Sequence, residues 1–86
     1  MVNLEQIRAD LEEALPPVIE RTKIAHYLGG MYKASTMSVY DSQGIGIKDP
    51  LRMEGNKVGY LKENLIEWFL SKIKVEEEEK EKHPHY

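Results

Sequence analysis

Apolar residues recur every three or four positions at the start of the chain, and charged residues stand between them. This spacing is typical of an amphipathic helix, whose apolar side faces a core. Asn3 can cap the helix, with Gln6 as the return partner of a capping box. Pro16 and Pro17 end it, because proline lacks an amide donor. We therefore predict an accessory amphipathic helix within residues 1–17, with its apolar positions at Leu4, Ile7, Leu11 and Leu15.

Two short helices are expected around a pair of glycines further along. Helical spacing returns from Arg21 to Leu28, and Gly29 and Gly30 stop this helix because glycine adopts left-handed φ angles at little cost. A second helix is expected from about Ala34 to Ser42, with Gly44 following its end. Two short helices separated by a glycine turn form a candidate helix-turn-helix. The residues of the second helix that should point inward are Met37 and Tyr40.

The next segment predicts a loop followed by a small β-hairpin. Strands are expected at Leu51–Glu54 and Lys57–Leu61, on either side of Gly55 and Asn56. This dipeptide suits a tight two-residue turn because both residues tolerate positive φ angles. Glu54 and Lys57 would then flank the turn as a cross-strand pair of opposite charges.

The strongest helical pattern runs from Lys62 to about Val75. Its apolar surface is too wide for a helix that contacts only one other element. We therefore expect the N-terminal helix to cover part of it. The apolar positions of one face are Leu65, Trp68 and Phe69, and those of the neighbouring face are Ile66, Leu70 and Ile73.

Length and composition limit the class of protein. A chain of 86 residues forms one small domain, and the absence of cysteine excludes disulfides and Cys-based zinc sites. No apolar run is long enough to span a bilayer, and the first residues lack the features of a signal peptide. We expect a soluble, cytoplasmic protein with no membrane partner.

The net charge of −3 hides an uneven distribution. Residues 18–74 hold nine Lys or Arg against six Asp or Glu, whereas the segments 1–17 and 75–86 are both acidic. A basic centre between acidic ends is compatible with nucleic-acid binding, which needs only a local basic face. The segment 75–86 is expected to be an acidic, disordered tail.

The order of these elements and the residues at their landmarks resemble the excisionase-like, MerR-type branch of the winged helix-turn-helix proteins. The matching stretches lie at 24–30, 36–44, 56–60 and 64–69. The resemblance implies a mainly α fold with a small β-hairpin, in which residues 18–74 form the DNA-binding domain and the N-terminal helix is an addition. Members of that branch regulate prophages, direct site-specific recombination or act as small transcription factors.

Three landmark positions depart from that pattern. Ile47 replaces a frequent proline, Glu20 replaces a capping Ser or Thr, and Asn56 replaces an arginine in the wing turn. The last change weakens the wing as a phosphate clamp, so several copies or partners would share the binding.

The resemblance places the DNA contacts on the second helix of the motif and on the wing. A recognition helix needs short side chains where it enters the major groove. Lys33 would lie near a phosphate, and Val39 could contact a thymine methyl group. Arg21 and Lys23 lie at the start of the first helix. A solvated turn is a simpler interpretation of these residues than a phosphate contact. The expected DNA-binding residues are Lys33, Ser35, Thr36, Ser38, Val39, Gln43, Arg52, Asn56 and Lys57.

Each expected contact has a simpler interpretation as an ordinary solvated side chain. For the helix this is a polar outer face, and for Arg52 and Lys57 it is contact with solvent and ion pairing with Glu54 across the hairpin. Trp68 and Tyr60 are interpreted as core aromatics rather than as a ligand pocket.

Nothing in the sequence indicates catalysis. No triad, phosphate loop or carboxylate pair occurs in a suitable context, and neither His26 nor the pair His83 and His85 makes a designed metal site. We expect no enzyme activity, no cofactor and no small-molecule effector.

The leading functional hypothesis is sequence-specific binding to double-stranded DNA, as a small transcriptional regulator or an excisionase-type factor in the control of a prophage or mobile element. An integrase or a second copy of the chain would be the further partner. The alternative is a protein-interaction module on the same fold, which would dock through its acidic helix or tail and the apolar face of the last helix. The DNA-binding part of a phage terminase small subunit is a third possibility.

Overall fold

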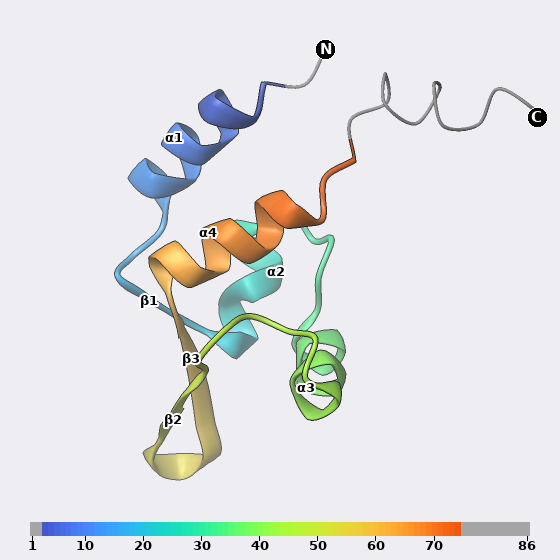
Figure 1. Cartoon of the computed structure of the whole chain (residues 1–86). Helices are drawn as coiled ribbons and strands as arrows, with labels where there is room; N and C mark the ends of the chain where they lie inside the picture. The colour runs from blue at the N-terminus through green and yellow to red at the C-terminus, as the bar shows by residue number, and fades with distance from the viewer. Residues whose placement is uncertain (1–2, 75–86) are drawn as a thin grey trace, which may run out of the picture.

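The computed structural model describes residues 3–74, and the predicted acidic tail lies outside them. The described part is mainly helical, with one small antiparallel sheet (Figure 1). The helices are α1 (Leu4–Ala14), α2 (Ile24–Tyr27), α3 (Ala34–Gln43) and α4 (Lys62–Ser71), with short 3₁₀ turns η1 (Arg21–Lys23) and η2 (Glu54–Asn56). The strands are β1 (Val18–Glu20), β2 (Leu51–Met53) and β3 (Lys57–Leu61).

Helix α1 forms where the spacing predicted it. The side chain of Asn3 caps it by accepting a hydrogen bond of 3.1 Å from the Gln6 amide. The return half of the predicted capping box is wrong, because the Gln6 side chain donates instead to Asp10, 3.0 Å away on the next turn. The helix ends at Ala14, ahead of the two prolines, and the following Leu15 is buried in the core.

The sheet has one strand more than the predicted hairpin. Strand β3 lies between β1 and β2 and pairs antiparallel with both. In the register of the hairpin, Met53 lies opposite Lys57, which leaves three residues in the turn. Glu54 therefore belongs to the turn, and the predicted cross-strand pair of Glu54 and Lys57 is wrong. Gly55 and Asn56 do take positive φ angles, 75° and 60°, as their residue types suggested.

Helix α3 matches its predicted position almost residue for residue. It extends one residue further than expected, to Gln43, and Gly44 ends it in the left-handed conformation with φ 75°. Met37 is fully buried and Tyr40 is half-buried, so both point inward as predicted. The preceding helix is shorter than expected, because its first three residues form the 3₁₀ turn η1 and α2 keeps only four residues.

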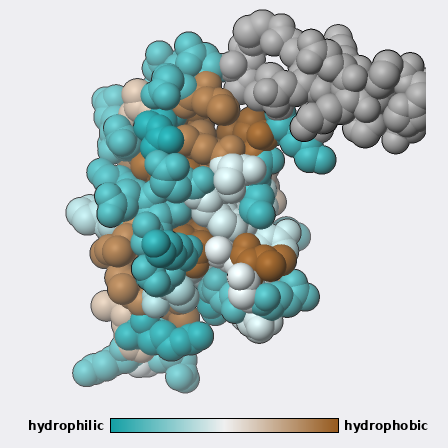
Figure 2. Space-filling model, in the orientation of Figure 1, coloured by the Kyte–Doolittle hydropathy of each residue, from teal (hydrophilic) through white to brown (hydrophobic). Residues whose placement is uncertain are grey.

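Helix α4 carries much of the core. It ends at Ser71 rather than near Val75, with the Lys72 and Ile73 amides bonded to carbonyls three residues back. Helix α1 packs on it, and apolar side chains gather between the two helices at the top of Figure 2. An ion pair of Arg8 with Glu67 and a 3.0 Å hydrogen bond from Lys62 to the Glu12 carbonyl fasten the contact.

The predicted docking face of α4 is therefore already occupied by its own chain. Four apolar side chains of the helix are buried, and two more are half-buried against the same core. The interaction-module alternative places its docking surface on this face, whose apolar side chains pack against the chain's own core. The buried residues are Leu65, Ile66, Trp68 and Leu70, and the half-buried ones are Phe69 and Ile73.

Across residues 3–74, none of the helices has the length and apolarity needed to cross a membrane.

Candidate functional site

Helix α3 and the hairpin of β2, η2 and β3 project from the same end of the molecule. In Figure 1 the hairpin is at the lower left, α3 is at the lower right, and α1 lies at the opposite end. The 3₁₀ turn η1 contacts both α3 and β3, so it bridges the base of this end. Hydrophilic side chains cover the tip of the hairpin in Figure 2.

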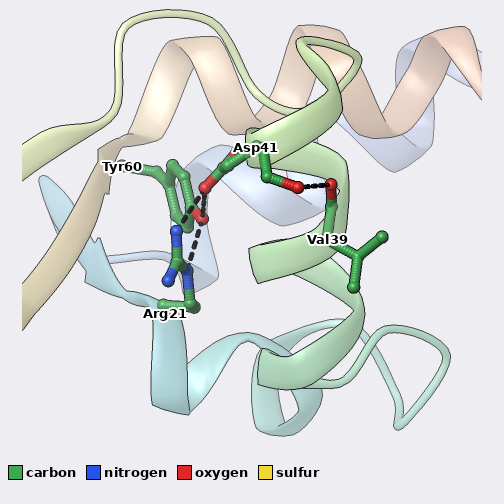
Figure 3. Close-up of polar contacts among 5 residues, drawn as sticks. Arg21, Val39, Asp41 and Tyr60 are labelled. Atoms are coloured by element: carbon green, nitrogen blue, oxygen red, sulfur yellow. Dashed lines mark hydrogen bonds and ion pairs between the residues drawn. The ribbon is translucent and has the colours of Figure 1, made fainter.

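A set of three polar side chains, which we call the polar triad, joins these elements (Figure 3). Arg21 comes from η1, Asp41 from α3 and Tyr60 from β3. The Arg21 guanidinium donates to the Asp41 carboxylate at 2.6 Å and to the Tyr60 hydroxyl at 3.0 Å. The Tyr60 hydroxyl donates to the same carboxylate oxygen at 2.6 Å. One charged network thus sets the position of α3 relative to the hairpin.

Two members of this network are largely buried. Only 5% of the Asp41 side chain is exposed, and Tyr60 has 0% exposure. Burial, together with the hydrogen bond to Asp41, raises the pKa of Tyr60 to about 12. The hydrogen bonds of Arg21 to Tyr60 and to Asp41 raise the pKa of Arg21, which keeps the guanidinium charged. The buried carboxylate is therefore compensated by a permanent positive charge.

The loop after α3 is shaped by the same carboxylate. A Cβ atom on Gly46 would lie 2.3 Å from Asp41 Oδ1, so a side chain at this position would collide with the triad. Ile47 follows and is buried in the core, which fixes the path of the loop. The lack of a side chain at Gly46 thus has a packing reason.

The outer face of α3 carries the first group of expected DNA-binding residues. Val39 is 50% exposed, while Met37 and Asp41 face the interior on the opposite side of the helix. Lys33 occupies the position just before the helix and is exposed. The remaining expected residues on this helix are Ser35, Ser38 and Gln43, which are exposed, and Thr36, which is half-buried.

The hairpin carries the second group. Arg52, Asn56 and Lys57 are exposed and help to line a shallow hollow whose other lining residues are Arg21, Met53 and Val58. Neither Arg52 nor Lys57 forms an ion pair with any of residues 3–74. The ion pairs with Glu54 are therefore absent from the described residues, and both cations face solvent.

Lys33 is likewise without an ion-pair partner within the described range. The residues expected from the sequence thus fall into two sets, one on α3 and one on the hairpin. Together the two sets include three cations without an ion-pair partner among residues 3–74: Lys33, Arg52 and Lys57.

Sequence reasoning missed the triad itself. The sequence predicts a solvated residue or a phosphate contact for Arg21 and a core aromatic for Tyr60, whereas in the structure both also bind Asp41. Lys23, the other cation of that turn, is exposed.

Two further observations bear on the chemistry. The described residues contain no cluster of three or more His, Cys, Asp or Glu able to hold a metal ion, and His26 is exposed with its ring edge-on to Tyr27 at 5.0 Å. Comparison with protein-family profiles, curated proteins and solved structures finds no match for the chain. A function must therefore be inferred from the residues of α3 and the hairpin.

Proposed function

We propose that the chain is a winged helix-turn-helix protein that binds double-stranded DNA sequence-specifically, as a small transcriptional regulator or excisionase-type factor. Residues 18–74 form the DNA-binding domain, α3 is the recognition helix and the β2–β3 hairpin is the wing. The observation that carries the proposal is that α3, the hairpin and unpaired cations lie together at one end of the molecule. An exposed helix of short side chains stands beside a hairpin, and unpaired cations flank both.

The size of α3 suits the major groove of B-form DNA. The groove is about 12 Å wide, and a helix with side chains measures about 10–12 Å across, so short outer side chains favour deep entry. Serines and Val39 form much of the outer face of α3. Because the triad fixes the wing beside this helix, the wing would reach the backbone or the adjacent minor groove when α3 enters the major groove.

The distribution of charge supports the same orientation. Lys33, Arg52 and Lys57 are free to contact phosphates, and the one carboxylate on α3, Asp41, is held inside by Arg21. The unpaired acidic side chains of α1 lie at the far end of the molecule (Figure 1). The overall charge of −3 therefore does not oppose binding at this end, since the nearest charges dominate within a Debye length of about 8–10 Å.

The test is the salt dependence of binding to labelled duplex DNA, measured by fluorescence anisotropy between about 50 and 200 mM salt. The double variant Arg52→Gln with Lys57→Gln should bind more weakly, and the slope of log K against log salt should fall by about 2, since each phosphate contact contributes about 0.9. Lys72→Gln is the control: it removes a single charge at the C-terminal end of α4, outside α3 and the hairpin, and should leave the slope unchanged. Absence of binding at low salt, or binding insensitive to salt, would refute the proposal.

A further inference from the structure

The outer face of α3 is centred on one apolar side chain. At about 100° per residue, Ser35 and Gln43 fall one turn before and one turn after Val39 on the same side of the helix. Val39 is the most exposed apolar residue of α3, and Met37 on the opposite side is fully buried. Anything that contacts this face therefore meets the valine methyl groups with a serine on one side and an amide on the other.

The composition of this face restricts which bases it can recognise. Guanine is read mainly by Arg or Lys, and residues 34–43 contain neither. Cytosine is read by an acidic side chain, and the only one in the helix, Asp41, is 5% exposed because it is held in the polar triad. Ser42 has its hydroxyl proton committed to the Val39 carbonyl at 2.8 Å.

Of the groups that remain, Ser35 can contact either class of base pair, so Val39 and Gln43 carry the preference. An apolar side chain packs against the 5-methyl group of thymine, and a glutamine amide forms a bidentate pair with adenine. Val39 and Gln43 are about 6 Å apart along the helix axis, a distance that covers neighbouring or next-neighbouring base pairs. Both therefore select the same class of pair within one short core.

We propose that α3 reads an A·T-rich core, in which Val39 senses the 5-methyl group of a thymine and Gln43 pairs with an adenine. This inference rests on the proposed DNA-binding function and names the class of site that the function would use. It gives the exposed valine and the withdrawal of Asp41 a common reason: one adds a methyl-reading group, and the other removes a cytosine-reading group.

The first part of the experiment is selection of bound duplexes from a random pool by the full chain. The selected sequences should share a short A·T-rich core. Each thymine of that core is then replaced in turn by deoxyuridine, which differs only by lacking the 5-methyl group. One replacement should weaken binding of the unaltered protein about fourfold, the effect of one buried methyl group.

The second part uses two valine variants that are matched in chemistry. Val39→Ala should bind the selected duplex more weakly and should lose sensitivity to deoxyuridine at the same position. Val18→Ala makes the same change on strand β1, where the valine is 41% exposed, and should keep the full deoxyuridine effect. Gln43→Ala should reduce the preference for A·T over G·C at one further position, by at least about fivefold.

The outcomes separate the two proposals. If no duplex is bound in a salt-dependent way, the DNA-binding function itself is refuted, and this inference with it. If DNA is bound but the selected core is G·C-rich, only the inference is refuted. The same holds if deoxyuridine never weakens binding, or weakens it equally for Val39→Ala.

Discussion

Removal of the Tyr60 hydroxyl tests whether the polar triad holds α3 and the hairpin together. Tyr60→Phe keeps the aromatic ring in the core and deletes a single oxygen. That oxygen donates to Asp41 at 2.6 Å and accepts from Arg21 at 3.0 Å, so two charge-assisted hydrogen bonds are lost. The ion pair of Arg21 with Asp41 at 2.6 Å remains, and it keeps the buried carboxylate from being stranded.

The size of the effect follows from these contacts. A hydrogen bond to a charged group contributes about 1.5–3 kcal/mol, and the surviving ion pair offsets part of the loss. We expect Tyr60→Phe to lower the free energy of unfolding by about 2–3 kcal/mol. For a domain of this size that corresponds to a fall in Tm of about 8–24 °C. It is a large fraction of the total stability of a small domain, which is about 5–15 kcal/mol.

The assay is urea unfolding followed by two signals, far-UV circular dichroism and the fluorescence of the buried Trp68. Coincident transitions with an unchanged m-value would show that only stability has changed. Tyr27→Phe is the matched control, because the Tyr27 side chain packs edge-on against His26 and its hydroxyl makes no hydrogen bond with residues 3–74. This control should cost less than about 0.5 kcal/mol.

Two results would refute the reasoning. A loss below about 1 kcal/mol for Tyr60→Phe would mean that the triad contributes no more than an ordinary neutral hydrogen bond. An equal loss for Tyr27→Phe would mean that the effect belongs to tyrosine hydroxyls in general rather than to the link between η1, α3 and β3.

Three further predictions concern Tyr60, Gly46 and helix α1. The pKa of Tyr60 is raised from 10.0 to about 12, so its stabilising effect is complete below pH 10 and is lost as the pH rises to 12. The free energy of unfolding, measured against pH, should therefore fall more steeply over that range in the unaltered protein than in Tyr60→Phe, and parallel curves would contradict this. Gly46→Ala should lower the Tm because its Cβ would lie 2.3 Å from Asp41 Oδ1. Gly30→Ala is the control, because its Cβ would meet no neighbour and only its positive φ would lower the Tm. An unchanged Tm for Gly46→Ala would exclude the close approach. A chain beginning at Val18 should melt lower than the full chain, since it leaves the face of α4 under α1 uncovered; calorimetry showing equal Tm values would exclude this packing.

The parts of the fold that were predictable from the sequence depend on local chemistry. The cap at Asn3 and the end of α3 at Gly44 each need only the residue and its immediate neighbours. The spacing of apolar residues in α1 also predicted its contact with α4, because an apolar stripe on a short helix must be covered. Four of the expected residues on α3 are exposed because its apolar positions face the core, whereas Thr36 is half-buried.

The parts that were missed depend on contacts between distant residues. Strand β1 has three residues and no alternation long enough to reveal it, and it exists because Ile19 pairs with Tyr60 across the sheet. Arg21 and Tyr60 are separated by 39 positions, so no local pattern could show that both bind Asp41. The turn of the hairpin is one residue longer than predicted, and the Gly-Asn dipeptide is compatible with both turn lengths.

We expect the polar triad to hold the end of the molecule that carries α3 and the hairpin more firmly than its apolar contacts alone would. Helix α3 has a single fully buried side chain, Met37, and the residues of β2 are at most half-buried. Few fully buried apolar side chains of α3 and β2 therefore help to set the orientation of the helix relative to the hairpin. Short, charge-assisted hydrogen bonds have a preferred direction, so the contacts of Asp41 with Arg21 and Tyr60 set that orientation. If α3 and the hairpin bind one DNA site together, weakening the triad must reduce affinity without removing any DNA contact, because each element would then have to be ordered separately on binding.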